Sequence, residues 1–181
     1  EEHAAVGTRF SENVLDATND YKLLVENESE LAGLPDDVKA AARAAAEKAG
    51  KPGYEFSLHF PSYYPILQFA DKRALRETIY RANATKASDQ GDAFSKKADW
   101  DNTQNIVTLL RLRDEEAKLL GYANFAEVSL VSKMATSPAQ VIAFLEDLAK
   151  RARPYAEKDL AELKQFAKEE LGLDELQAWD V

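Results

Sequence analysis

A long apolar stripe with helical spacing occupies residues 138–171 of this sequence. Its members recur mostly at intervals of four and three residues: Val141, Leu145, Leu148, Ala152, Tyr155, Leu163, Phe166 and Leu171. Ser137, Pro138 and Gln140 supply a cap, a first-turn proline and a capping-box glutamine, and Gly172 supplies a stop. A helix of this length needs a partner for its stripe, so the pattern predicts a mainly α-helical fold.

Pro154 lies inside this predicted helix. A proline there removes one backbone hydrogen bond, and its ring clashes with the carbonyl four residues earlier. We therefore expect the helix to bend between Lys150 and Pro154.

A second stripe predicts a helix over residues 102–120, and its members are Ile106, Leu110, Ala117 and Leu120. Asp99 or Asp101 can cap this helix, and Gly121 closes it. Both long stripes have near-heptad spacing and the connection between them is short, so we expect these two helices to pack together. The end of the longer stripe, from Leu163 onward, would extend past its neighbour.

Four shorter helices are also predicted: one carrying Val6, Phe10, Val14 and Ala17, one over Asp36–Ala49, one from Lys72 to about Lys86, and one from Asn124 to about Met134. The first has no capping residue ahead of it and is expected to be cut at Glu1. Asp71 can cap the third, whose apolar face contains Leu75, Ile79 and Ala82. Asn124 and Glu127 form a capping box for the fourth.

Two short segments rich in aromatic and β-branched residues, Tyr21–Glu26 and Tyr54–Phe60, predict strands that pair around the alanine-rich helix between them. Pro61 ends the second because proline cannot donate to a ladder. A lone ribbon is marginal in water, so one face must pack on a helix. The polar stretch Ser88–Ala98 is expected to be a loop. The predicted fold class is therefore an amphipathic helix bundle with a small two-stranded β ribbon.

Composition excludes several classes of function. The chain has 181 residues, 45% apolar and 30% charged, with a net charge of −9. The negative charge disfavours nucleic acid as a partner. No apolar run approaches the roughly 20 residues that span a bilayer, and the first residues do not resemble a signal peptide. The absence of cysteine fits a reducing compartment, so we expect a cytoplasmic protein that does not enter a membrane.

The candidate metal ligands are few. His3 and His59 are the only histidines, they lie in unrelated segments, and neither belongs to a His-Glu-x-x-His pattern. His59 alternates with its neighbours on the second predicted strand, where it is expected to point outward rather than to bind metal. Because cysteine is absent, a thiolate site is excluded.

Other candidate groups have ordinary explanations. The acidic pairs Glu115–Glu116 and Asp36–Asp37 are expected on solvated faces, since adjacent helical residues point in different directions. The basic group Lys150, Arg151 and Arg153 is expected to form ion pairs within its helix. Ser88, Asp89 and Gln90 have no histidine near them in sequence, so nucleophilic catalysis is not supported. Four aromatic residues would contact peptide only if this segment lined a groove, and packing is the simpler role: Tyr63, Tyr64, Trp100 and Trp179.

Several longer motifs carry a family resemblance: FSENVLDAT at 10–18, LAGLPDDV at 31–38, FPSYYPIL at 60–67, LRETIYRANATKASDQG at 75–91, DNTQNIVTLLRLRDEEAKLLGYANFAEVSLVSKMA at 101–135 and LQAWD at 176–180. In this order they resemble the oligopeptidase A and thimet oligopeptidase family of zinc peptidases, most of all its bacterial oligopeptidase A members. The resemblance runs almost from end to end of the chain.

The resemblance implies a zinc endopeptidase acting on short peptides, with a largely helical body and a deep channel. In this family two histidines and a downstream glutamate hold zinc, and the glutamate of His-Glu-x-x-His is the general base. Residues 1–181 would form a single helical segment upstream of that region and contribute scaffold and channel wall. We therefore expect no catalytic, cofactor-binding or metal-binding residue in this chain, and zinc only in the parent enzyme.

Two other interpretations remain open. The amphipathic helices alone would equally suit an α-helical protein-interaction module without an enzymatic parent. A truncated paralogue could bind peptides without cleaving them. The expected partners of the peptidase segment are short peptides and the remainder of the parent chain, and the segment alone can self-associate.

Overall fold

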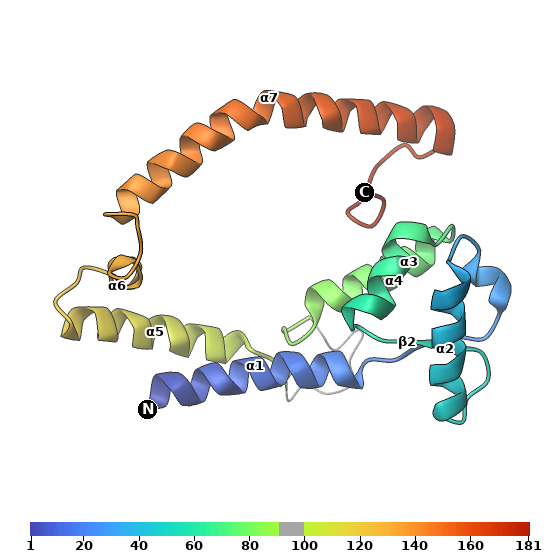
Figure 1. The fold of residues 1–181 in the computed structure, drawn as a ribbon, viewed down its shortest axis with the longest axis horizontal. Coiled ribbons are helices and arrows are strands. Elements are labelled where there is room, and N and C mark those ends of the chain that lie inside the picture. The colour runs from blue at the N-terminus through green and yellow to red at the C-terminus, as the bar shows by residue number, and fades with distance from the viewer. Residues whose placement is uncertain (91–99) are drawn as a thin grey trace. The chain divides into compact units, whose positions relative to one another are not determined.

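The computed structural model describes residues 1–90 and 100–181 (Figure 1). These residues are mainly helical, with a small two-stranded antiparallel sheet, so the predicted fold class is confirmed. The chain divides into two compact units. The first unit is Glu1–Ile106 together with Gln177–Val181, and the second unit is Val107–Leu176.

The first unit contains, in chain order, α1 (Glu2–Asp20), β1 (Leu23–Val25), the 3-10 helix η1 (Glu28–Leu31), α2 (Asp36–Lys48), β2 (Tyr54–Phe56), α3 (Phe60–Phe69) and α4 (Arg73–Thr85). Helix α5 (Thr103–Leu119) begins in the first unit and continues into the second. The second unit also contains α6 (Phe125–Leu130) and α7 (Pro138–Leu171).

The two strands pair where the sequence predicts, although both are shorter than expected. Leu23 lies opposite Phe56 and Val25 opposite Tyr54 in an antiparallel register. Alternate residues therefore share one face, and Val25, Tyr54 and Phe56 are buried there. Helix α2 packs against β2, so the ribbon has the helical support that a lone hairpin requires.

Helix α3 corrects the sequence analysis, which placed a strand over Tyr54–Phe60 and no helix after it. The strand ends at Phe56, and Phe60 already begins α3. Pro61 lies in the first turn of this helix, where a missing N–H costs nothing because first-turn donors have no partner within the helix. The helix was not predicted because Pro61 and Pro65 are residues that usually end a helix.

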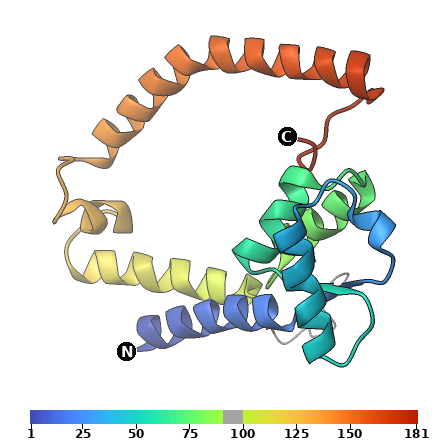
Figure 2. The same ribbon diagram turned by 45° about the vertical axis from the view of Figure 1, so that its right-hand side comes forward.

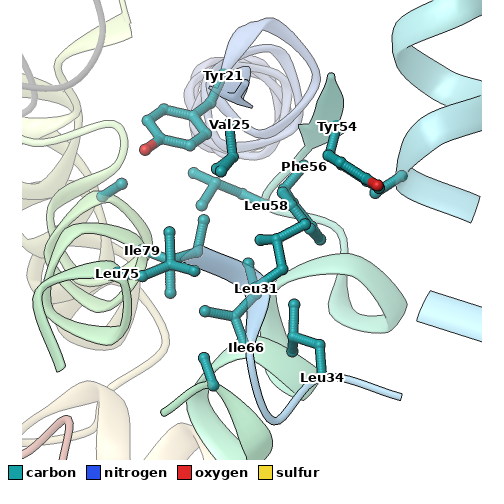
Figure 3. Packing of buried hydrophobic residues seen from close by; sticks show 13 residues of the cluster. Tyr21, Val25, Leu31, Leu34, Tyr54, Phe56, Leu58, Ile66, Leu75 and Ile79 are labelled. Carbon is teal, nitrogen blue, oxygen red and sulfur yellow. The ribbon is translucent and has the colours of Figure 1, made fainter. Parts of the chain in front are cut away.

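The core of the first unit lies between the ribbon and helices α2, α3 and α4, as Figure 3 shows. The largest fully buried apolar side chains are Leu31, Phe56, Ile66 and Ile79. Burial of each contributes about 1.5–3 kcal/mol. The predicted apolar face of α4 is confirmed, because its Leu75, Ile79 and Ala82 are all buried. The residues labelled in Figure 3 also include these members of the core cluster: Tyr21, Val25, Leu34, Tyr54 and Leu58.

The predicted cap of α4 is wrong. Lys72, not Asp71, precedes the helix, and no side chain accepts a hydrogen bond at that end. The backbone N–H of Asp71 donates instead to the carbonyl of Ala32 at 2.9 Å. Asp71 therefore joins the loop after η1 to the turn between α3 and α4.

A buried amide network joins α1 to the beginning of α5. The Nδ2 of Asn13 donates to Oδ1 of Asn102 at 3.0 Å, and Nδ2 of Asn105 donates to the same oxygen at 2.8 Å. The Nδ2 of Asn102 donates to the carbonyl of Phe10 at 3.0 Å. Asn102 is only 2% exposed. Both the oxygen and the nitrogen of its side-chain amide therefore have hydrogen-bond partners, as a buried polar group requires.

We predict that Asn102→Ala lowers the free energy of unfolding by about 2 kcal/mol, because the Asn13 amide and the Phe10 carbonyl lose their buried partner. Urea denaturation followed by circular dichroism measures the change. The matched control is Asn105→Ala, which removes one bond to the same oxygen from a half-buried position. Equal losses for the two variants would contradict a central role for Asn102.

The predicted bounds of α5 and the predicted start of α6 are confirmed to within about one residue, whereas the predicted end of α6 is wrong. Oδ1 of Asp101 accepts from the N–H of Thr103 at 2.8 Å, while Asp99 lies outside the described residues, as does most of the predicted loop 88–98. Gly121 has a φ of 82° and ends α5. The Asn124 side chain accepts from the Glu127 N–H, and Glu127 accepts from the N–H of residue 123. Helix α6 ends at Leu130, four residues before the predicted end.

Helix α7 has the predicted length and ends. Oγ of Ser137 accepts from the Gln140 N–H at 3.2 Å, and the Gln140 side chain accepts from the Thr136 N–H at 2.7 Å. Gly172 ends the helix with a φ of 64°. Figures 1 and 2 both show α7 bending near its middle, where Pro154 lies.

The predicted packing of α5 against α7 is wrong. Within the second unit the part of α5 after Ile106 lies apart from α7 in both views, and α7 has its main contacts with α6 (Figures 1 and 2). A stripe shows that a helix needs a partner but does not identify it. Leu163, Phe166 and Leu171 are exposed as expected, at 45%, 56% and 59%. No described helix combines the length and the apolar character needed to cross a membrane.

Candidate functional site

The two histidines lie on separate elements. His3 is in the first turn of α1, and His59 is the exposed residue that precedes α3. The expected position of His59 on a strand is therefore corrected. Among residues 1–90 and 100–181, no group of three or more His, Cys, Asp or Glu side chains is arranged to hold a metal ion.

The charged groups named from the sequence form ion pairs within their own helices. Glu115 accepts from Arg111 at 2.6 Å, and Asp36 lies 3.1 Å from Lys39. On α7, Arg151 pairs with Asp147 at 2.8 Å and Arg153 with Glu157 at 2.7 Å. Apart from the half-buried Lys39 these side chains are exposed, so the pairs contribute little stability. The expectation of intrahelical pairing is confirmed for Arg151 and Arg153.

Ser88 is held by its local turn rather than by a catalytic partner. Its hydroxyl donates to the carbonyl of Thr85 at 2.6 Å and accepts from the Gln90 N–H at 3.2 Å. A nucleophilic serine needs a neighbouring base that removes its proton. Both contacts are with backbone groups, so among the described residues neither of them supplies such a base.

Helix α3 presents an exposed aromatic group. The rings of Phe60 and Tyr64 stack with centroids 4.6 Å apart, and Tyr63 meets Phe60 edge-on at 5.9 Å. Phe60 is 61% exposed. Tyr63 also packs on the core cluster, whereas the outward stack of Phe60 and Tyr64 provides a surface on which an apolar group could pack.

Trp179 is buried, as its packing role requires. Its ring lies 5.9 Å from that of Tyr80, and the guanidinium of Arg81 lies 4.8 Å from the ring centroid. Arg73 approaches the same ring at 6.0 Å. The indole Nε1 is buried without a hydrogen-bond partner in the described part of the chain. Trp179 therefore does not belong to an open peptide-binding surface, and Trp100 is half-buried near the start of α5.

Asp180 is a buried carboxylate with two arginine partners, and the sequence did not predict it. Its carboxylate accepts from Nη2 of Arg73 at 2.7 Å and from Nη2 of Arg76 at 2.9 Å, and its side chain is 2% exposed. The hydrogen bond from Arg73 holds the pKa of Asp180 well below its ordinary value. Arg76 and the Gln177 N–H act in the same direction, while burial opposes them. A buried carboxylate with two guanidinium partners is a strong structural contact.

The sequence contains a partial signal for this contact. Arg73 and Arg76 are three residues apart on a predicted helix, so both can face one anion. The anion lies 107 residues away from Arg73, and nothing local indicates which of the many carboxylates it is.

An open groove of about 300 Å³ lies in the first unit between α2 and β2. Alanines of α2 form its apolar side, while Lys22, Glu55 and His59 lie at its polar side. The Glu55 carboxylate is already paired with Lys51 at 3.0 Å. The hydroxyls of Ser57 and Ser62 also line the groove, and each accepts from a backbone N–H, that of His59 at 3.4 Å and that of Ser57 at 2.9 Å.

Comparison with known proteins identifies the family. The model described as Peptidase family M3 matches residues 66–181. Oligopeptidase A of Escherichia coli strain K12 is 52% identical over 97% of this chain and 25% of its own length. The probable cytosolic oligopeptidase A of Arabidopsis thaliana is 40% identical over 96% of this chain and 25% of its own length. Dipeptidyl carboxypeptidase of Salmonella typhimurium is 30% identical over 99% of this chain and 25% of its own length.

The chain thus spans about a quarter of the length of the curated relatives that it matches. The family match covers well over half of the chain and includes the residues of α4 and of the Asp180 contact. The similarity to oligopeptidase A extends to the ribbon and α1, in agreement with the motifs seen in the sequence. This chain therefore belongs to peptidase family M3.

Proposed function

We propose that this chain is part of a zinc-dependent oligopeptidase that hydrolyses short peptides, and that it supplies scaffold and channel wall rather than catalytic residues. The observation that carries the proposal is the 52% identity to a protein named oligopeptidase A over nearly the whole chain. The relatives' names support peptides as the substrate class, and the name of the probable cytosolic oligopeptidase A of Arabidopsis thaliana supports a cytoplasmic location. The proposed partners are short peptides and the rest of the parent protein.

The described residues do not fit a zinc site. Three or four donors are needed, and the two histidines lie on separate elements without carboxylates gathered around them. We therefore assign the zinc ligands and the general base to a part of the peptidase outside residues 1–181.

The exposed apolar surface supports a scaffold role. Most of α7 is exposed, including Ile142, Phe144 and Leu160 as well as the end of the stripe. A soluble protein that stands alone seldom leaves so large an apolar surface uncovered. Further protein packed over α7 would complete its burial, and a wall made of rigid helices would limit which peptides enter a channel.

We expect the chain alone to hold no stoichiometric zinc after dialysis against a weak chelator and to leave a fluorogenic peptide intact. Metal analysis and a peptidase assay measure both, with Escherichia coli oligopeptidase A as the positive control. About one tightly held zinc per chain would overturn the ligand argument, since adventitious ions rarely survive such dialysis.

The gene provides a second test of the proposal. A His-Glu-x-x-His pattern encoded downstream of Val181 would support a segment of a larger peptidase. A stop codon close to Val181 would instead favour a truncated peptide-binding paralogue. Continued coding sequence without that pattern would favour a helical interaction module.

A further inference from the structure

The segment Gln177–Val181 belongs to the first unit although it follows the second unit in sequence. Trp179 and Asp180 of this segment both contact α4. The Asp180 carboxylate is bound by Arg73 and Arg76, and Nε of Arg76 donates to the carbonyl of Trp179 at 2.9 Å. The Trp179 ring lies against Tyr80 and Arg81. These contacts all join the segment to helix α4.

The segment is also folded on itself. The N–H of Gln177 donates to Oδ2 of Asp180 at 3.0 Å, and the N–H of Asp180 donates to the carbonyl of Gln177 at 2.9 Å. These contacts make a compact turn that presents Trp179 and Asp180 together. The backbone N–H groups of Gln177 and Asp180 are bonded inside the turn, whereas the hydrogen bonds to α4 come from the side chains of Arg73 and Arg76.

A structure attached in this way can open without unfolding its support. The α4 residues that face the opposite direction, Leu75, Ile79 and Ala82, belong to the core and would keep the helix in place. Trp179 also loses a hydrogen bond on closing, because its buried indole N–H has no partner among the described residues. Water would satisfy that donor in an open state, so the unpaired N–H favours opening.

We propose that Gln177–Val181 is a latch that closes on α4, opens as a unit while the rest of the first unit stays folded, and is held shut mainly by the Asp180 carboxylate. Closure ties the chain that follows α7 back to α4. The inference concerns local opening and does not depend on the proposed peptidase activity.

The test uses the full chain with Trp100→Phe, so that Trp179 is the sole tryptophan. Acrylamide quenching of its fluorescence reports the opening of the latch. In Asp180→Asn, which keeps the side-chain size and removes the charge, the quenching constant is expected to rise about threefold or more as the buried indole becomes accessible. The helical circular dichroism and the midpoint of the main thermal transition should stay close to those of the parent.

Two further variants sharpen the test. Asp174→Asn removes an exposed carboxylate nearby in sequence and should leave quenching unchanged. Arg76→Lys keeps the charge but loses the forked guanidinium geometry, so quenching should rise to an intermediate value. Unchanged quenching in Asp180→Asn would overturn the role of the carboxylate. Increased quenching that appears only together with loss of the main transition would show that the segment unfolds with the core and is not a latch.

Discussion

Sedimentation of this chain at increasing concentration is expected to show self-association, and Leu163→Glu is expected to weaken it about tenfold or more. Helix α7 is 34 residues long, and its apolar face is exposed along most of that length. At 1.5 Å per residue it offers a strip about 50 Å long. Burial of one leucine contributes about 1.5–3 kcal/mol, and a glutamate at the same place would bring a charge into the contact.

The control variant is Ala161→Glu. It adds the same charge to the same helix two residues earlier, where the side chain points to the polar side opposite Leu163. Association through the apolar face predicts that Ala161→Glu behaves like the parent chain, while the association of Leu163→Glu is weaker by about tenfold or more. A parent chain that is monomeric at every concentration, or equal weakening by both variants, would refute the role of this face.

The elements that the sequence predicted well are those with local signals. The Ser137 cap, the Asn124 cap and the glycine ends at 121 and 172 all act within a few residues, so their pattern is visible in the sequence itself. The face of α4 was also predictable, because a helix of known period that packs on a core buries one side.

The errors concern proline context and long-range pairing. Helix α3 was missed because Pro61 and Pro65 suggest a break, although first-turn proline suits a helix start. The α5–α7 pairing was wrong because amphipathicity carries no information about the partner. The Asp180 contact was missed because α4 lies more than 100 residues away from it. For the candidate site, the position of His59 just before α3 required the structure, because its alternation with Leu58 and Phe60 in the sequence resembles a strand.

The most damaging single substitution that we predict is Gly33→Ala, which should lower the free energy of unfolding by about 4 kcal/mol or more. Gly33 has a φ of 86°, and an added Cβ would lie 2.1 Å from the carbonyl oxygen of Phe69. The loop cannot simply move away, because Leu31 and Leu34 on either side of it are buried. The hydrogen bond from the Asp71 N–H to Ala32 also holds the two segments together.

Substitutions at two other glycines distinguish the effect of the Cβ clash at Gly33 from the effect of a positive φ. Gly50 also has a positive φ, at 67°, but an added Cβ would meet nothing within 4 Å, so Gly50→Ala should cost only about 1 kcal/mol. Gly7 lies inside α1 in open space, and Gly7→Ala should stabilise by about 0.5–1 kcal/mol because alanine favours a helix. Urea denaturation of the three variants would yield this order. If Gly33→Ala cost no more than Gly50→Ala, the close approach to Phe69 would not limit the fold, since the two positions share the same left-handed strain and differ in their neighbours.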